Sequence, residues 1–146
     1  MIYYILANPN AGSRKGERSL KLLLPYLEKE GLSYKLFATE HTGQEAAFIQ
    51  KILEEKSAED RLVILGGDGT ISLALNALPD NLSFGYIPSG SGNDFARSLG
   101  LSFDPIQAFE NIRQDKTKDF YVIHYKSQSF SGYALNNVGI GLDAAI

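Results

Sequence analysis

The sequence predicts an α/β fold of three layers, α/β/α, built on a mostly parallel sheet. Short apolar, β-favouring segments alternate with segments of helical periodicity over residues 1–113, and such alternation is typical of parallel sheets with right-handed crossovers. The run Leu62-Val63-Ile64-Leu65 is apolar without interruption, as expected of a central strand covered on both faces. A polar loop that contains glycine follows each expected strand.

We expect four strands in this part of the chain, at residues 2–7, 32–38, 62–65 and 83–87. A first helix is expected at residues 15–30, because four leucines fall at positions i, i+3, i+4 and i+7: Leu20, Leu23, Leu24 and Leu27. Gly31 can cap the end of this helix. Pro25 predicts a kink or a broken turn inside it.

The later helices are predicted from their ends as well as from their apolar faces. Thr42 and Glu45 have the spacing of a capping box, and the buried side of the helix after them is expected to comprise Ala46, Ile49 and Leu53. Pro79 ends the next helix. The apolar residues of that helix have the same spacing: Ile71, Ala74, Leu75 and Leu78. A short helix at 95–99 is closed by Gly100, and Asp104 with Pro105 begins a last helix that continues to Arg113.

The final segment has a different pattern. Residues 119–125 and 130–138 are expected to be two strands of a hairpin, with no helical pattern between them. We therefore expect residues 1–120 to form the α/β domain and residues 121–146 to begin a second, β-rich domain. About 25 residues are too few to fold alone, so the chain is expected to be the N-terminal part of something longer.

Composition narrows the functional classes. The 146 residues are 44% hydrophobic and 21% charged, which is typical of a globular protein. Fourteen basic and 17 acidic residues give a formal net charge of −3, so nothing attracts nucleic acid globally. The sequence has no cysteine, no apolar run near the roughly 20 residues of a membrane span and no signal-peptide pattern. A cytoplasmic protein without a nucleic-acid partner is the expectation.

The most informative stretch is Gly66-Gly67-Asp68-Gly69-Thr70, which follows the apolar run. Its glycines let the backbone turn sharply and approach a ligand closely, while Asp68 and Thr70 supply a carboxylate and a hydroxyl. That chemistry suits a phosphate bridged to Asp68 by a metal ion, for which Mg²⁺ is the expected one. Asp68 could instead act as a general base or merely cap the following helix.

Four loops are expected at one edge of the sheet, at residues 8–12, 39–43, 66–70 and 88–94. Because they all follow parallel strands, they can converge on one crevice. The alternative is that their glycines and asparagines simply make turns. Neither a Gly-x-x-x-x-Gly-Lys-Ser/Thr loop nor a usable Gly-x-Gly-x-x-Gly fingerprint is present, and the match at residues 139–144 has no room for the helix it needs.

Three segments together resemble the diacylglycerol kinase catalytic-domain family, which is related to sphingosine kinases and NAD kinases: Asn8-Pro9-Asn10-Ala11-Gly12, the Gly-Gly-Asp-Gly-Thr turn, and residues 88–97 with the sequence Pro-Ser-Gly-Ser-Gly-Asn-Asp-Phe-Ala-Arg. The resemblance continues to residues 136–144, which are similar to the segment that opens the family's C-terminal β-sandwich. It implies an ATP-dependent lipid kinase that transfers a phosphoryl group to a hydroxyl of diacylglycerol or a similar lipid, with Mg²⁺ as the metal.

The same resemblance implies the residues of the site. ATP would contact Asn8, Pro9, Asn10, Ala11, Gly12, Thr39, Gly66, Gly67, Asp68, Gly69, Thr70, Ser91 and Asn93. Asp68 would be the catalytic residue, and the metal would be held, directly or through water, by Asp68, Asp94 and Asp119. The family's general base has no counterpart in these 146 residues, so this chain alone is expected to be inactive or nearly so.

Two departures from the family pattern stand beside the match. Ser72 and Leu73 replace the asparagine and glutamate frequent after the central motif, and Ala11 stands where serine is usual. An NAD kinase-like enzyme and a nucleotide-binding module without chemistry are therefore retained as alternatives. A lipid substrate implies transient contact with the inner face of the membrane, and a homodimer stays open.

Overall fold

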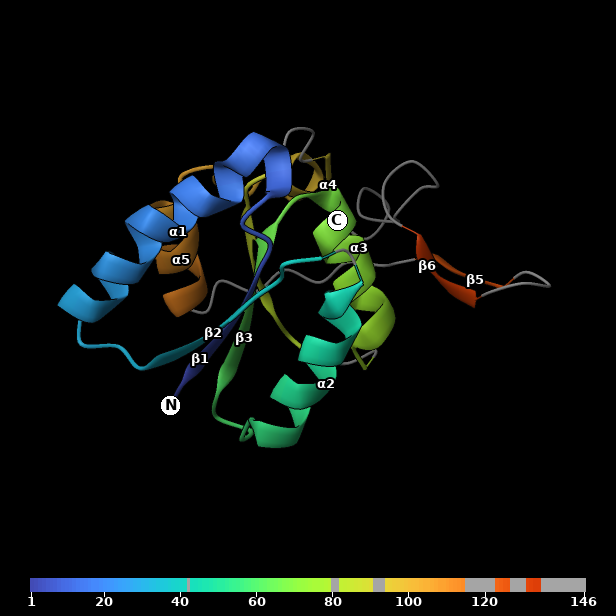
Figure 1. Cartoon of the computed structure of the whole chain (residues 1–146), viewed down its shortest axis with the longest axis horizontal. Helices are drawn as coiled ribbons and strands as arrows, with labels where there is room; N and C mark the ends of the chain where they lie inside the picture. The colour runs from blue at the N-terminus through green and yellow to red at the C-terminus, as the bar shows by residue number, and fades with distance from the viewer. Residues whose placement is uncertain (42, 80–81, 91–93, 115–122, 127–130, 135–146) are drawn as a thin grey trace.

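The computed structural model describes residues 1–41, 43–79, 82–90, 94–114, 123–126 and 131–134. A four-stranded parallel sheet, in the order β2-β1-β3-β4, forms its centre (Figure 1). In chain order the elements are β1 (Tyr3–Ala7), α1 (Ala11–Lys29), β2 (Tyr34–Ala38), α2 (Gln44–Glu55), β3 (Arg61–Gly66), α3 (Asp68–Ala77), β4 (Gly85–Pro88), α4 (Asp94–Leu99), α5 (Pro105–Arg113), β5 (Ile123–Lys126) and β6 (Ser131–Ala134).

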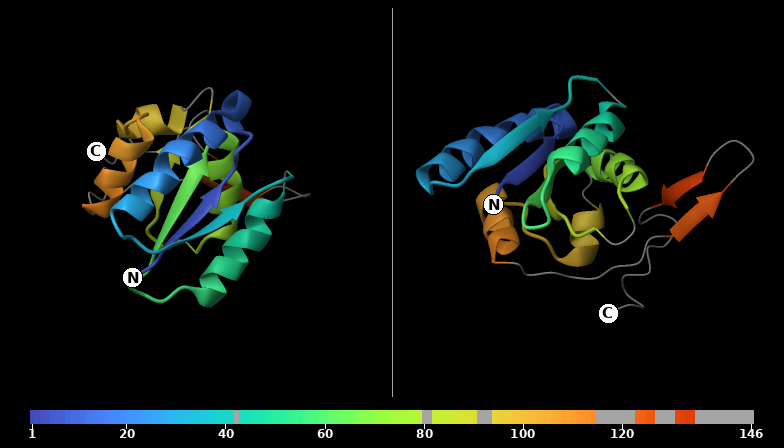
Figure 2. Two further views of the ribbon diagram at one scale, coloured as in Figure 1. Left: turned by 60° about the vertical axis from the view of Figure 1, so that its left-hand side comes forward. Right: turned by 90° about the horizontal axis from the view of Figure 1, so that it is seen from below.

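Helices cover both faces of the sheet, as Figures 1 and 2 show. Alternate residues of each strand point to opposite faces, so Tyr4 and Ile64 pack with α2, α3 and α4, while Ile5 and Val63 pack with α1 and α5. Both sets are almost fully buried, and each large apolar side chain buried in this way contributes about 1.5–3 kcal/mol. The predicted three-layer α/β/α fold with a parallel sheet is confirmed.

The start of α1 is a left-handed turn. Gly12, Ser13 and Arg14 have φ values of 58°, 57° and 71°, and regular helix follows them, close to the predicted start at Lys15. Of the kink or broken turn predicted at Pro25, the broken turn is wrong, because α1 continues through Pro25 with helical backbone angles. The proline removes the helical partner of the Lys21 carbonyl group, and both Lys21 and Pro25 are exposed residues.

Glycines and one aspartate end or begin the helices as expected. Gly31 and Gly100 have φ values of 69° and 67°, and the residue after each donates its N–H back into the last turn of the helix, over 3.0 Å from Leu32 and 2.9 Å from Leu101. The Asp104 carboxylate accepts a hydrogen bond of 3.0 Å from the Ile106 N–H at the start of α5.

Helix α2 differs from its prediction. Its N-cap is Gly43, in a left-handed conformation with φ 99°, and Thr42 lies outside the described residues. The predicted buried face is right for Ile49 but wrong for Ala46, which is exposed, because the helix turns Glu45 and Ile52 inward instead. Glu45, predicted as part of the capping box, is buried, and its carboxylate accepts a hydrogen bond of 3.0 Å from the N–H of Gly43.

Strands β5 and β6 pair antiparallel, with Ile123 opposite Ala134 and Lys126 opposite Ser131. Strand β6 falls within its predicted range, and β5 extends one residue past its predicted end, to Lys126. The other residues of that region lie outside the described part of the chain. In the described residues no helix combines the length and apolar character needed to cross a lipid bilayer.

Candidate functional site

The candidate site lies at the carboxyl ends of the parallel strands. Hydrogen bonds continue the sheet into the loops: the N–H of Asn8 donates to the Leu65 carbonyl over 2.9 Å, that of Thr39 to Ala7 over 2.8 Å, and that of Ser89 to Gly66 over 2.9 Å. Strands β2 and β3 lie on opposite sides of β1. The loops that follow these strands therefore lie on the two sides of β1 at this edge. Ligands of open α/β sheets bind at such a switch point.

Two hollows open at this edge. The larger one, of about 440 Å³, is lined by Asn8, Ala11, Gly12, Glu45, Gly67, Asp68, Gly69, Thr70, Leu73 and Gly90. The smaller one, of about 110 Å³, is lined by Asn8, Asn10, Thr39, Glu40, His41 and Glu45. The structure thus brings together residues of all four loops that the sequence placed in one crevice. Ser91, Asn93 and Asp119 lie outside the described residues.

Glycine is required where these loops touch each other. A Cβ atom on Gly12 would lie 2.7 Å from the Ser89 carbonyl oxygen, and one on Gly67 would lie 3.0 Å from the Gly90 Cα atom. Gly69 is different, because a Cβ atom there would meet nothing within 4 Å. Gly69 borders the larger hollow. The space left by its missing side chain is therefore open to a ligand, whereas at Gly12 and Gly67 a neighbouring loop occupies that space.

Asp68 stands at the first position of α3 and joins two elements. Its carboxylate accepts hydrogen bonds from the N–H groups of Asp94, over 3.0 Å, and Phe95, over 3.3 Å. Asp68 therefore caps α4. Helix α3 itself has no side-chain cap, because its N-cap residue is Gly67. The capping role considered from the sequence exists, but for a different helix. Two N–H donors leave free lone pairs on both oxygens.

Asn8 fixes the loop after β1 against the central motif. Its side-chain amide donates to the Thr70 hydroxyl over 3.3 Å, and its side-chain oxygen accepts from the Asn10 N–H over 3.1 Å. Gly16 sits directly against this loop, since a Cβ atom there would lie only 2.1 Å from the Asn8 carbonyl oxygen. The polar groups of Asn8 and Thr70 are thereby held at the border of the larger hollow.

Tyr86 holds the start of the central motif by a hydrogen bond to its backbone. Its buried hydroxyl donates a hydrogen bond of 2.8 Å to the Gly66 carbonyl, which also accepts from the Ser89 N–H. Burial, and then the negative charge of Asp68, raises the pKa of Tyr86 well above its usual range. The phenol stays protonated, and it holds the end of β3 as a donor at any ordinary pH.

The first turn of α3 can bind an anion. The leading N–H groups of any α-helix have no partner within the helix, and the residues of the first turn of α3, Asp68, Gly69 and Thr70, line the larger hollow. Aligned N–H groups and the helix dipole favour a phosphate at this position. Asp68 would repel the same phosphate, by about 4 kcal/mol at 4 Å and an effective dielectric of 20, unless a cation lies between them.

A metal would depend mainly on Asp68. Within the described ranges no group of three or more His, Asp or Glu side chains is arranged to hold an ion. The Asp94 side chain is 57% exposed and lies 3.7 Å from the Arg97 guanidinium. The donor set fits Mg²⁺, which keeps several waters and uses one or two carboxylates together with substrate phosphates.

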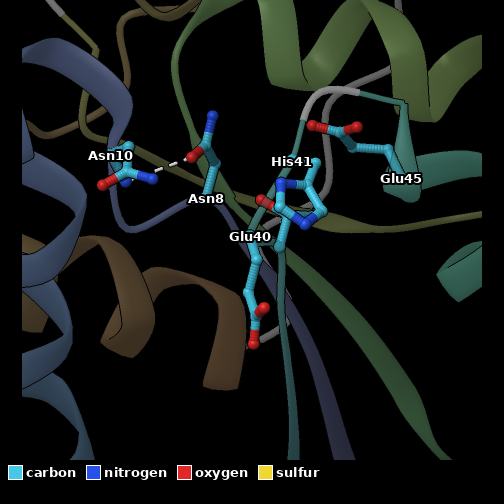
Figure 3. Close-up of a pocket in the computed structure, with 6 residues that line it drawn as sticks. Asn8, Asn10, Glu40, His41 and Glu45 are labelled. Atoms are coloured by element: carbon cyan, nitrogen blue, oxygen red, sulfur yellow. Dashed lines mark hydrogen bonds between the residues drawn. The ribbon is translucent and has the colours of Figure 1, made fainter.

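Glu45 is a residue of the site that the sequence reasoning assigned only to a helix cap. It borders both hollows, although its side chain is almost fully buried. Figure 3 shows it at the start of α2, across the smaller hollow from Asn8 and Asn10, with Glu40 and His41 on the intervening loop. No Lys or Arg of the described residues forms an ion pair with this buried carboxylate, and only the structure shows that it is buried.

The chain is similar to a described protein family and to several bacterial proteins. The family model described as "Diacylglycerol kinase catalytic domain" matches residues 3–125. A Bacillus subtilis protein named "Putative lipid kinase YtlR" is 31% identical over 99% of this chain, and a Staphylococcus saprophyticus protein named "Diacylglycerol kinase" is 36% identical over 74% of it. A crystal structure from Bacillus anthracis, of "a putative diacylglycerol kinase", superposes with a TM-score of 0.67 and 26% identity over 83% of this chain.

The chain spans about half the length of these relatives or less: 49% of the Bacillus subtilis protein, 36% of the Staphylococcus protein and 44% of the Bacillus anthracis chain. The matched region includes the loops that line both hollows and the motif at Asp68. The family resemblance and the fold expected from the sequence are both confirmed by these matches. The chain belongs to the diacylglycerol kinase catalytic domain family.

Proposed function

We propose that this chain is the nucleotide-binding part of an ATP-dependent lipid kinase, which transfers a phosphoryl group to a hydroxyl of diacylglycerol or a similar lipid. The observation that carries the proposal is the position of Asp68. Its carboxylate borders the hollow at the first turn of α3, where phosphate is favoured. Family membership supports the reaction class.

Each part of the site has a role in this proposal. The N–H groups at the start of α3 bind phosphate oxygens, and Asn8 and Thr70 orient the loop that faces them. Asp68 holds the metal, which neutralises phosphate charge and aligns the terminal phosphoryl group. Asp94 and Asp119 are proposed to support the metal and its water. Ser91 and Asn93 are proposed nucleotide contacts, together with Thr39 and residues 8–12.

A lipid substrate implies that the enzyme contacts a membrane. Diacylglycerol partitions into bilayers, so the enzyme would work at the inner face of the membrane by transient surface contact, while the protein itself remains cytoplasmic. The active unit would include a further domain, because the relatives are about twice as long as this chain or longer. The general base that accepts the lipid hydroxyl proton is expected there.

The test is phosphorylation of dispersed diacylglycerol by the full-length protein with Mg²⁺ and ATP, in the wild type and in Asp68→Asn. Loss of a charge that acts on the transferred group should reduce turnover by roughly 10²–10³-fold or more. The asparagine can still accept one hydrogen bond from the start of α4. Asp104→Asn is the matched control, since it also removes one carboxylate but keeps a good cap, at a residue that lines neither of the two hollows.

Three outcomes are informative. Turnover of diacylglycerol that Asp68→Asn abolishes, with Asp104→Asn unaffected, supports the proposal. Turnover of a different hydroxyl substrate and none of diacylglycerol would contradict the lipid assignment. Equal activity of wild type and Asp68→Asn, with folding checked by circular dichroism, would contradict the role of Asp68.

Leu73 favours a second candidate, a module that binds nucleotide without chemistry. Its side chain is 38% exposed and borders the larger hollow, at a position where the family resemblance leads one to expect glutamate. An apolar group there cannot accept a hydrogen bond or bind a cation. Calorimetry that detects Mg²⁺-dependent ATP binding by a full-length protein without turnover, and gain of turnover in Leu73→Glu, would support this candidate.

A further inference from the structure

The outer edge of β2 is a feature that the proposed reaction does not use. In the order β2-β1-β3-β4 this strand is paired on one side only among the described residues. Its residues are exposed or half-buried, whereas all those of β1 are buried. β2 also contains no proline, which would block further pairing. An open edge of this kind offers its backbone groups to another strand.

The ladder between β1 and β2 determines which backbone groups of β2 point outward. The Tyr3 N–H donates to the Ser33 carbonyl over 3.0 Å, and the Thr39 N–H donates to the Ala7 carbonyl over 2.8 Å. The pattern of a strand repeats every second residue, so the odd-numbered residues of β2 bond to β1. The even-numbered residues turn their N–H and carbonyl groups to the free edge: Tyr34, Leu36 and Ala38.

A second copy of β2 fits this edge when it runs antiparallel with Leu36 at the centre. In that register Leu36 lies opposite Leu36 of the second copy, and Tyr34 lies opposite its Ala38. Residues that face each other in this way exchange both of their backbone hydrogen bonds, so every outward donor and acceptor of β2 gains a partner. The Leu36 side chain, which is 38% exposed, is then covered by its own counterpart.

The charged side chains on the other face of β2 are complementary in the same register. Lys35 lies opposite Phe37 of the second copy, with Cβ atoms about 4.5–5.5 Å apart. Lys35 forms an ion pair of 3.1 Å with Glu55. The Lys51 ammonium lies 6.0 Å from the centroid of the Phe37 ring, and no acidic side chain of the described residues pairs with it. The Glu55 carboxylate of each copy therefore comes near the Lys51 ammonium of the other.

We propose that two copies of this chain form a dimer in which their β2 strands pair antiparallel about Leu36, so that two four-stranded sheets become one continuous sheet. A dimer with a twofold axis requires a surface that is complementary to itself, and the β2 edge meets this requirement in both its backbone groups and its charges. A strand of another protein could use the backbone groups, but it would not place Leu36 opposite itself.

The experiment is sedimentation velocity of the full-length protein over a series of concentrations. The wild type should sediment as a dimer. Leu36→Glu and Leu36→Lys each place two like charges opposite one another, so each should weaken the dimer by about tenfold or more. An equal mixture of the two variants should restore the dimer, because a glutamate then lies opposite a lysine. Leu22→Glu is the matched control, since Leu22 is a 58% exposed leucine on α1, and it should stay dimeric.

Leu36→Pro gives a second route to the same answer. It removes an outward N–H and no hydrogen bond to β1, so it should be monomeric while circular dichroism stays that of the wild type. A wild type that is monomeric at every concentration, or a dimer that all three Leu36 variants keep, would overturn the proposal. So would a mixture of Leu36→Glu and Leu36→Lys that associates no better than either alone, or a dimer that Leu22→Glu disrupts equally.

Discussion

Gly67 and Gly69 belong to one motif, but the structure predicts opposite effects when each is changed to alanine. At Gly67 the new methyl group would lie 3.0 Å from the Gly90 Cα atom and 3.7 Å from the Gly90 nitrogen. These are backbone atoms, which cannot rotate away. At Gly69 the methyl group would meet nothing within 4 Å, and the residue already lies in the first turn of α3.

The magnitudes follow from these contacts. Gly67→Ala forces two loops apart and should cost about 1–3 kcal/mol, the usual range for an overpacked site. Gly69→Ala should stabilise the fold by about 0.5–1 kcal/mol, because alanine is a better helix former than glycine. Thermal unfolding should therefore give a melting temperature that falls for Gly67→Ala and rises by roughly 2–5 °C for Gly69→Ala.

Ligand binding gives the second half of the test. Gly69 borders the larger hollow, so its added methyl group would occupy ligand space, and we expect Mg²⁺–ATP to bind Gly69→Ala roughly tenfold more weakly or worse. A variant that is more stable and yet binds less tightly would separate the two effects. The reasoning is refuted if Gly69→Ala is destabilised as much as Gly67→Ala, or if it binds nucleotide like the wild type.

Three further predictions concern stability. Asp104→Ala removes the hydrogen bond to Ile106 at the start of α5 and should cost about 1 kcal/mol in urea unfolding, with Asp104→Asn close to wild type. Gly16→Ala would place a methyl group 2.1 Å from the Asn8 carbonyl oxygen; it should lower the melting temperature more than an exposed substitution on α1, and an unchanged value would contradict the close packing. Two backbone N–H groups lower the pKa of Asp60, so its stabilising effect is full above the usual carboxyl pKa and is lost as pH falls through the lowered value. The difference in melting temperature between wild type and Asp60→Ala should accordingly shrink in acid, and a difference that grows there would contradict this assignment.

The sequence predicted best those features that one or two residues determine locally. Asp104 and Pro105 specify a helix start by themselves, and the observed α5 has the predicted limits. Glycine after a helix specifies a left-handed end in the same way at Gly31 and Gly100. The convergence of loops at one edge was also predictable, since parallel strands leave it no alternative.

Features that depend on tertiary surroundings were not predictable. Whether Pro25 breaks a turn depends on how its surroundings accommodate the ring and the lost hydrogen bond, and at this exposed position α1 keeps helical backbone angles. Ala46 was expected on the buried side of α2 and is exposed, whereas Glu45, expected only as a cap residue, is buried, against the usual preference for an apolar residue. The partner of Asp68 was missed for a related reason: α4 begins 26 residues later in the chain.

The bond between Asp68 and α4 also makes the site observable without a chemical probe attached to it. The amide protons of Asp94 and Phe95 point at the carboxylate on which the proposed chemistry depends. Any change of charge there, by protonation, by substitution or by a bound cation, alters the magnetic environment and the solvent exchange of these two protons. At 16.0 kDa the chain suits amide NMR spectroscopy, in which their two resonances would report the state of Asp68 directly, independently of any turnover.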